Sequence, residues 1–465
     1  MKKIIIIPIL FCILISLTNC TTLDFEEFDE RDALDEKLVF TGPSSRRNFL
    51  YNIYGSLPRM DNYLDKGAML ACATDDAEFV NDFSTIQRFN TANISIFFNP
   101  EDQWKNMYTG IRKCNIFLNK AVIGTLDEYK NNTDPHRDGD EYYPELVKAL
   151  EYQRAEARFL RAYFYFELIR RYGGVPIITD LSIDMESENF EIQRNSFEEC
   201  RNFILKELNE IIPLLPVVHD DSDGLQSETG RATKGAAMAL KSRLLLYAAS
   251  PLFNTSNDVN LWKQAAKASL DIIESGLYSL EPNYVDLFLK SNSKELIYER
   301  RVADSNDFER ANYPIGFDGG NTGTCPSQNL VDAYEMQSTG LGIDQNGSGY
   351  NEKNPYSGRD PRFYATINYN NAYWAFRNIE IWQGGRDAPP IQNSTKTGYY
   401  LKKYLNPNVK IGSGENVIQR HTFYIFRLGE MYLNYAEAMN EAFGPEADPE
   451  GFGMTALEAV NTIRT

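Results

Sequence analysis

Long stretches of the chain carry apolar residues at three- and four-residue steps, the spacing of one face of an α-helix. The clearest stretch is 151–172, where Ala155, Phe159, Ala162 and Phe166 share one face and arginines occupy others. Two glycines and a proline follow it, and these residues end helices. The pattern therefore predicts an amphipathic helix that ends at the glycine pair.

The same periodicity predicts several more helices, each close to a stop signal or a turn. The first of these helices begins at residue 104. The others are expected at 197–215, 233–250, 261–276, 423–444 and 455–465. Gly235, Ala236 and Ala239 lie near one side of their helix, so a neighbouring helix can approach closely. Trp104 and Trp262 lie on apolar helical stripes and are expected in the core. Helical pairs rich in Ala, Leu and Tyr resemble tetratricopeptide repeats, although their spacing is irregular. The predicted fold is mainly α, a degenerate tetratricopeptide-like scaffold of helical pairs.

The amino-acid composition of the sequence changes between residues 301 and 420. Gly, Asn and Pro are frequent there and are interleaved with Tyr, Phe and Trp, so long helices are not expected. Such composition favours short strands and shaped loops, which is where binding surfaces usually lie. We therefore expect a long, irregular, loop-rich ligand-binding region at 301–420, supported by the helices that precede and follow it.

Composition and charge exclude several classes of protein. The chain has 465 residues, 47 Lys and Arg, 65 Asp and Glu, and a net charge of −18, so nucleic acid is not an expected partner. Only three histidines occur, and none forms a metal-binding or hydrolase motif with another. Aromatic residues make up 13% of the chain, which provides much flat apolar surface for stacking or packing.

The first twenty residues read as a targeting segment. Two lysines precede an apolar run that is too short for a comfortable transmembrane helix, and Cys20 follows Leu-Thr-Asn. This end resembles the lipobox of bacterial lipoproteins, so residues 1–19 are predicted to be a lipoprotein signal peptide and Cys20 to carry acyl chains. The acidic stretch that follows resembles an export signal to the outer face of the outer membrane. Cys72, Cys114, Cys200 and Cys325 show no paired spacing, which leaves disulfides open.

The best candidate chemistry lies in the loop-rich region. A sugar ring has an apolar C–H face and a rim of hydroxyls, so its binding needs aromatic platforms beside planar polar side chains. Tyr373, Trp374, Arg377 and Trp382 supply both kinds of group outside any helical stripe. We expect at least one of the two tryptophans to face solvent, and Trp374 in particular to be a surface platform. The competing interpretation is that both fill a small core.

Several segments together resemble the SusD/RagB family of outer-membrane nutrient-binding lipoproteins. Besides the lipobox leader, they are RAEARFLRAYFYFELIRRYGGVPII, GRATKGAAMALKSRLLLYAASPLFN, PSQNLVDAYEM, DPRFYATI and RLGEMYLNYAEAMNEA followed by ALEAVNTIR, in the order of the family. The resemblance implies an N-terminal SusD-like helical region at 20–300 and a C-terminal RagB/SusD region at 301–465. Family members usually continue beyond the last helix, so part of the C-terminal region is expected to be missing after Thr465.

The resemblance also implies a function and a partner. The protein would sit as a lid over a SusC-like, TonB-dependent barrel, capture glycans or in some members peptides, and pass them on for import. Asp75 and Asp76 fall near the place where the family has a ligand-contacting acidic residue, although a helix-capping or solvated pair is the competing interpretation.

A peptide-binding member of the same family and a glycoside hydrolase are the alternatives to glycan binding. A glycoside hydrolase would need two carboxylates across a cleft, and 65 acidic residues allow a suitable pair, but no repeating β/α pattern supplies the usual scaffold. The family resemblance implies binding without turnover. Asp344, Asn346 and Ser348 resemble the start of a calcium loop, but its twelfth position is Pro355 instead of Glu. We expect no cofactor.

Overall fold

The computed structural model describes residues 36–58, 67–130, 139–179, 181, 192–219, 230–290, 292–412, 414 and 416–464. The predicted signal peptide, Cys20 and the acidic stretch after it lie outside the described residues. The chain divides into two units, one formed by Met1–Tyr51 with Lys120–Leu150 and the other by Asn52–Asn119 with Glu151–Thr465. The predicted division at residue 300 stays a prediction.

The smaller unit is built from helical segments. It contains α2 (Glu36–Thr41), most of α3 (Pro43–Tyr54), the short 3-10 helix η2 (Ile123–Tyr129) and the first turns of α6 (Gly139–Tyr172). Within it, the rings of Phe40 and Phe49 lie 5.2 Å apart, and Leu50 and Leu126 are fully buried.

The larger unit contains the remaining long helices, and the prediction of a mainly α fold is confirmed. They are α5 (Trp104–Lys120), the rest of α6, α7 (Phe197–Ile211), α8 (Lys234–Ala249), α9 (Val259–Ile273), α14 (Leu428–Phe443) and α15 (Ala456–Arg464). Side chains cap the first turns of some of these helices: Ser196 and Glu199 form a capping box on α7, and Thr233 accepts from the Ala236 amide of α8. Within the described part of the chain, no helix is both long enough and apolar enough to span a bilayer.

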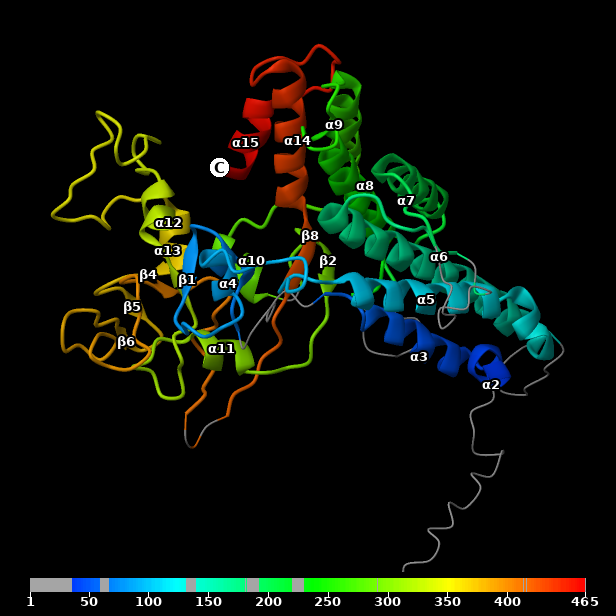
Figure 1. Ribbon diagram of the computed structural model, residues 1–465, viewed down its shortest axis with the longest axis horizontal. Coiled ribbons are helices and arrows are strands. Elements are labelled where there is room, and N and C mark those ends of the chain that lie inside the picture. Colours follow the sequence, from blue (N-terminus) through cyan, green and yellow to red (C-terminus); the bar gives the residue numbers. More distant parts are fainter. Residues whose placement is uncertain are drawn as a thin grey trace, which may run out of the picture. The chain divides into compact units, whose positions relative to one another are not determined.

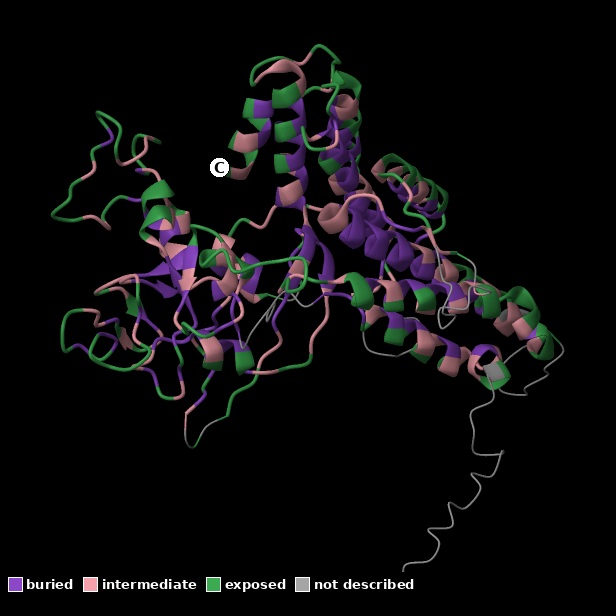
Figure 2. Cartoon of the chain, viewed as in Figure 1, coloured by how far each residue is buried: buried purple, intermediate pink, exposed green. Residues whose placement is uncertain are grey.

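Helices α8, α9, α14 and α15 share one core. They form the helical group that includes α14 and α15 in Figure 1, and Figure 2 shows their inward faces in purple, the colour of buried residues. Trp262 lies in this core with 3% of its surface exposed, as predicted. Arg243 of α8 donates to Glu430 of α14 at 2.6 Å, and its guanidinium lies 4.1 Å from the centre of the Phe426 ring. Trp104 departs from the prediction. It is the first residue of α5 and remains 36% exposed, although its ring lies 5.0 Å from that of Tyr108.

A strand stands where the sequence predicted the start of a helix. Residues Phe423–Arg427 form β8, which pairs antiparallel with β2 (Leu296–Arg300), and the helix α14 begins only at Leu428. The aromatic and β-branched residues of β8 favour an extended chain that can pack against α6. This contact is visible in the ring of Tyr163 on α6, which lies 6.4 Å from that of Phe426.

The loop-rich region predicted at 301–420 has short elements and long connections. Its helices are α11 (Asp307–Asn312), α12 (Gln328–Ala333) and α13 (Pro361–Thr366), with α4 (Gln87–Asn90), the 3-10 helix η1 (Leu70–Ala73) and α10 (Tyr284–Leu289) contributed from earlier in the chain. Its antiparallel strand pairs are β1 (Ala77–Phe79) with β3 (Thr324–Pro326), β4 (Ile367–Asn368) with β7 (Tyr400–Leu401), and β5 (Tyr373–Trp374) with β6 (Arg377–Asn378). The prediction of short strands and loops is confirmed.

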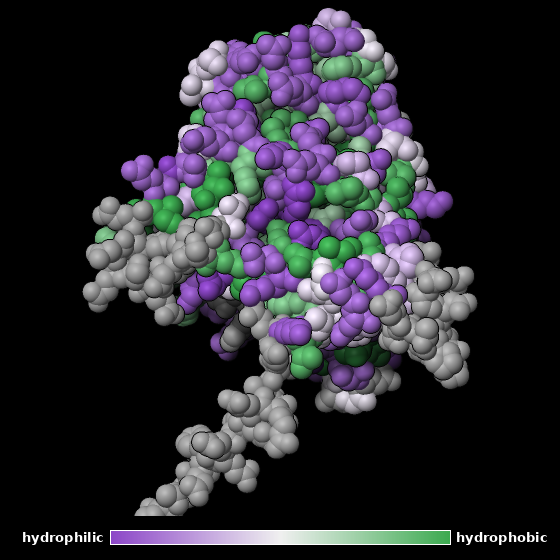
Figure 3. Space-filling view, turned by 90° about the vertical axis from the view of Figure 1, so that its right-hand side faces the viewer, coloured by the Kyte–Doolittle hydropathy of each residue, from purple (hydrophilic) through white to green (hydrophobic). Residues whose placement is uncertain are grey.

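The surface reflects the polar composition of the chain. On the face shown in Figure 3, hydrophilic side chains predominate and hydrophobic ones appear among them in small groups. The most exposed apolar side chains among the described residues include Phe83, Ile96 and Phe97, each more than nine-tenths exposed. Many aromatic side chains of the loop-rich region are instead buried, in one cluster that includes Trp374 and another that includes Phe363.

Candidate ligand-binding site

The β5–β6 hairpin is the centre of the candidate site. Trp374 pairs with Arg377, and the connection is a two-residue turn of Ala375 and Phe376. Ala375 has φ of 46°, in the left-handed region that tight hairpin turns require. Because side chains alternate along a strand and the turn reverses the chain, Tyr373 is left 71% exposed and Phe376 65% exposed, while Trp374 points inward.

Trp374 is a core residue, so the prediction that it is a surface platform is wrong. Only 4% of its surface is exposed, and its ring lies 4.7 Å from the ring of Tyr313 and 5.3 Å from that of Phe317. Both contacts are edge-to-face, the geometry that aromatic pairs favour. Trp382, in the loop after β6, is 48% exposed, so one of the two tryptophans does face solvent.

The structure separates the polar residues that the sequence predicted for the site. The Arg377 guanidinium pairs with the Asp387 carboxylate through two contacts of 2.6 and 2.7 Å and lies 3.9 Å from the centre of the Phe317 ring. It is therefore held within the protein. Asp75 and Asp76 are exposed beside β1, where the Asp76 carbonyl accepts from the Ser327 amide at 2.8 Å. Neither aspartate is brought to the hairpin cavities described next.

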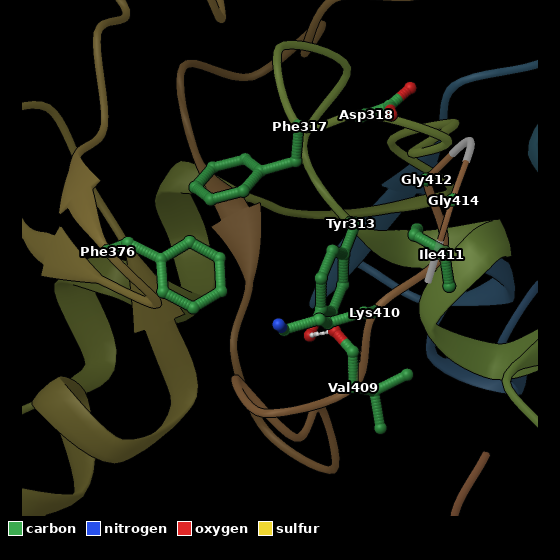
Figure 4. A pocket seen from close by; sticks show the side chains of 9 residues that line it. All are labelled: Tyr313, Phe317, Asp318, Phe376, Val409, Lys410, Ile411, Gly412 and Gly414. Atoms are coloured by element: carbon green, nitrogen blue, oxygen red, sulfur yellow. Dashed lines mark hydrogen bonds between the residues drawn. The ribbon is translucent and has the colours of Figure 1, made fainter. Parts of the chain in front are cut away.

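A cavity of about 280 Å³, here called the Phe376 cavity, lies beside the hairpin. It is lined by Tyr313, Phe317, Asp318, Phe376, Val409, Lys410, Ile411, Gly412 and Gly414. In Figure 4 the Phe376 ring reaches the cavity from the hairpin, and Tyr313, Val409 and Lys410 lie across from it. The Tyr313 hydroxyl donates to the Val409 carbonyl at 3.1 Å, and burial raises the pKa of Tyr313 well above its usual range. A neutral phenol thus fixes this wall.

Glycine at position 412 lets the two walls approach each other. A Cβ there would lie 2.2 Å from a carboxylate oxygen of Asp318, which is much closer than atoms can pack. The absence of a side chain therefore allows the Asp318 carboxylate to lie beside the backbone of residue 412. The cavity presents one acid, Asp318, and one base, Lys410, at the edge of an otherwise aromatic and apolar lining.

A second cavity of about 250 Å³, here called the Lys402 cavity, uses other residues of the same hairpin. It is lined by Val285, Phe288, Leu289, Ala365, Tyr373, Trp374, Ala375, Lys402, Lys403, Tyr404, Leu405 and Pro407. Burial lowers the pKa of the Lys402 ammonium and raises that of the Tyr404 phenol to about 12. The Lys403 nitrogen lies 4.3 Å from the centre of the Phe288 ring.

The remaining sequence candidates do not form a site together. Asp344 and Asn346 are exposed, whereas Ser348 is buried and its hydroxyl donates to the Ile343 carbonyl at 3.4 Å. Among the residues that the structure describes, no group of three or more His, Cys, Asp or Glu is placed to hold a metal ion. The cysteines Cys72, Cys114, Cys200 and Cys325 are buried and free.

The structure adds residues that sequence reasoning missed. Phe376 lies next to the residues that the sequence predicted for the site. Nothing in the sequence indicates that the turn exposes Phe376 and buries Trp374. Tyr313 and Phe317 come from 60 residues earlier in the chain, and Lys402 and Lys403 from beyond it. The adjacent lysines were the one visible signal, because a lysine pair beside tyrosines in a turn-rich segment is unusual in an acidic chain.

Comparisons with known proteins agree on one group. A family model described as the SusD family matches residues 294–465, and one described as starch-binding, associating with outer membrane, matches residues 45–246. The SusD-like protein P38 of Formosa agariphila is 25% identical over 403 residues, which are 77% of this chain and 70% of that protein. A solved SusD-like protein from Bacteroides fragilis has a TM-score of 0.70 and 27% identity, over 92% of this chain and 79% of that one. A solved laminarin-binding SusD-like protein has a TM-score of 0.60 and 21% identity, over 90% and 84% of the two chains.

Proposed function

Because this chain belongs to the SusD/RagB family, we propose that it is a surface lipoprotein that captures oligo- or polysaccharides and delivers them to a SusC-like, TonB-dependent transporter of the outer membrane. The ligand is proposed to bind beside the β5–β6 hairpin. The printed descriptions of the matched model and of the laminarin-binding structure, which name starch and laminarin for those proteins, support a glycan as the ligand here.

The observation that carries the proposal is the Phe376 cavity. Its exposed phenyl ring offers an apolar face to the C–H face of a sugar, and the Asp318 and Lys410 side chains offer an acceptor and a donor to sugar hydroxyls. Each stacking contact of this kind contributes about 0.5–1.5 kcal/mol. One or two such contacts with a few hydrogen bonds give weak binding, which suits a protein that must release its ligand to a transporter.

Binding without turnover is part of the proposal. Hydrolysis of a glycosidic bond uses two carboxyl groups that flank the bond. Among the described residues that line the Phe376 cavity, Asp318 is the single carboxylate, and the Lys402 cavity has none. The arrangement supports a binding site in preference to a hydrolase.

The variant Phe376→Ala tests where the glycan binds. The expected result is a loss of affinity of about two- to tenfold, the equivalent of one stacking contact. The melting temperature should stay within about 2 °C of the unchanged protein, because a ring that is 65% exposed leaves no buried cavity. Calorimetric titration with glycans and thermal unfolding measure the two quantities.

A matched control is Leu252→Ala, which removes another exposed apolar side chain, 75% exposed and outside both cavities. It should change neither quantity. Unchanged glycan affinity in Phe376→Ala would show that the site is misplaced. If the unchanged protein binds no glycan, the proposed function itself is wrong.

The lipid anchor and the barrel partner are proposed from the sequence and the family. The leader at 1–19 ends at Cys20, and the family model that matches 45–246 is described as associating with the outer membrane. Cys20→Ala should release the protein from outer-membrane fractions into a soluble form, because acyl chains bind bilayers through their many buried methylenes. Cell fractionation and surface labelling measure this. Retention of the variant at the cell surface would contradict the anchor, and extraction of the unchanged protein without any β-barrel would contradict the partner.

A further inference from the structure

We propose that the Lys402 cavity binds the acidic group of an anionic sugar, a carboxylate or a sulfate ester, so that the captured glycan is acidic. This inference rests on the proposed function and narrows its ligand class. The cavity combines two lysines with an aromatic lining next to the exposed Tyr373, which is a different chemistry from that of the Phe376 cavity.

The first argument is the unbalanced charge of the cavity. Lys402 and Lys403 both line it, and among the described residues no carboxylate lies within ion-pair distance of either ammonium group. Some other lysines of the larger unit do have a carboxylate partner: Lys263 pairs with Glu450 at 2.7 Å, and Lys290 pairs with Asp286 at 2.6 Å. In a chain with a net charge of −18, these two adjacent lysines lack a carboxylate partner within the part of the chain that the structure describes. A bound anion would balance their positive charge.

The acidic residue nearest in sequence to the lining of this cavity does not supply that charge. Asp286 follows Val285 on α10, but its carboxylate is held by Lys290. The other described residues that line the cavity have no charged side chain. Burial alone lowers the pKa of Lys402, which reflects the cost of a partly buried cation without a counter-charge. An entering anion would remove this cost and form a charge-assisted hydrogen bond.

The second argument is that the Lys403 ammonium group is held in place beside aromatic rings. Its nitrogen lies 4.3 Å from the centre of the Phe288 ring, 5.6 Å from that of Tyr284 and 5.8 Å from that of Tyr404. Cation–π contacts position an ammonium group but do not neutralise it. The backbone is fixed as well, because the amides of Lys402 and Lys403 donate to the Thr366 carbonyl at 2.9 and 3.2 Å.

The third argument is shape. At about 250 Å³ the cavity is slightly smaller than the pockets of about 300–1,000 Å³ that hold drug-sized ligands, so it suits one sugar ring. The hairpin lines both cavities, with Phe376 in one and Tyr373 in the other. A glycan that crosses the hairpin turn would place one ring on Phe376 and a neighbouring acidic ring at Lys402.

The test uses sugars that differ only at C6. Trisaccharides of glucose, galactose and mannose are each titrated into the full chain with a hydroxyl, a carboxylate or a sulfate at that carbon. The unchanged protein should bind an acidic form at least about tenfold more tightly than its neutral counterpart, since hydrogen bonds to charged groups contribute that much. Added salt should weaken binding of the acidic form and leave the neutral form unaffected.

Lys402→Gln and Lys403→Gln should each remove most of this preference, so that the affinity for the acidic form falls toward the affinity for the neutral form. The matched control is Lys267→Gln, which makes the same change of net charge at an exposed position of α9 and should keep the preference. If Lys402→Gln lowers the melting temperature, Lys402→Met, which keeps the apolar stem, replaces it. The carboxylate and sulfate forms tell which acid is preferred.

Three results would overturn the inference. Equal or tighter binding of the neutral sugars would show that the ligand is not acidic, while the proposed function would stand. A preference for acidic sugars that persists in both lysine variants would place the anion elsewhere. No binding of any of the nine sugars would overturn the inference and the glycan-binding proposal together.

Discussion

Trp374→Ala should lower the free energy of unfolding by about 3–5 kcal/mol, the cost of removing a large aromatic side chain from a packed core. The indole is 4% exposed and packs edge-to-face on Tyr313 and Phe317, inside a cluster that includes Tyr400 and Phe423. Alanine would leave a cavity that these rings cannot fill without moving the hairpin. Equilibrium unfolding in denaturant, followed by circular dichroism, measures the loss.

The control for this prediction is Trp382→Ala in the loop that follows β6. Trp382 is 48% exposed and outside the buried cluster, so its removal should change the free energy of unfolding far less. Since Trp374 also borders the Lys402 cavity, stability and not affinity is the informative measurement. Equal effects of the two variants would contradict the burial of Trp374.

The helices of this chain could be predicted because their information is local. The stripe of 151–172 and the small residues of 233–250 encode both the element and the face it buries, and Trp262 is buried on such a stripe. The strand at 423–427 was missed for the same reason. Its apolar residues fit a helical stripe as well as a strand, and the choice is made by pairing with β2, more than 120 residues earlier in the chain.

The site was less predictable because its parts are distant in sequence. Trp374 and Trp382 have similar neighbours, and whether each is buried depends on residues that the fold brings from elsewhere. Tyr313 and Phe317 cover Trp374, whereas no such cluster covers Trp382 among the described residues. The exposed aromatic groups of the hairpin are instead Tyr373 and Phe376, so the segment was identified correctly but the roles of its residues were not.

Arg377 shows the same limit for a polar residue. The sequence favoured it as a ligand-binding group, but the fold provides a partner in Asp387, ten residues later. Because the Asp387 side chain is fully buried and that of Arg377 is 16% exposed, the pair is shielded from water. The Asp387 carboxylate also accepts from the Glu380 amide at 2.8 Å, so it fixes the loop after β6.

Arg377→Met should therefore destabilise the protein by about 3–5 kcal/mol, because removing one partner leaves a buried carboxylate without its counter-charge. Methionine keeps the unbranched apolar stem, so the loss reflects charge more than volume. Denaturant unfolding at pH 7 measures it. The double variant Arg377→Met with Asp387→Asn should recover part of the loss, since the buried charge is then gone as well.

Arg386→Met is the matched control, because it breaks an ion pair in the same loop that faces water. The Arg386 side chain is 60% exposed and contacts the Glu380 carboxylate at 2.6 Å, which lowers the pKa of Glu380 to about 2. Solvent screens this pair, so its loss should change stability little. If Arg377→Met is as stable as Arg386→Met and binds glycan more weakly, then Arg377 serves the ligand instead of the fold, and the assignment reverts to the one that the sequence favoured. If Arg377→Met is strongly destabilised and the added Asp387→Asn recovers part of that loss, the ion pair between Arg377 and Asp387 holds the hairpin against the loop. The exposed rings of Tyr373 and Phe376 then depend on this ion pair for their position.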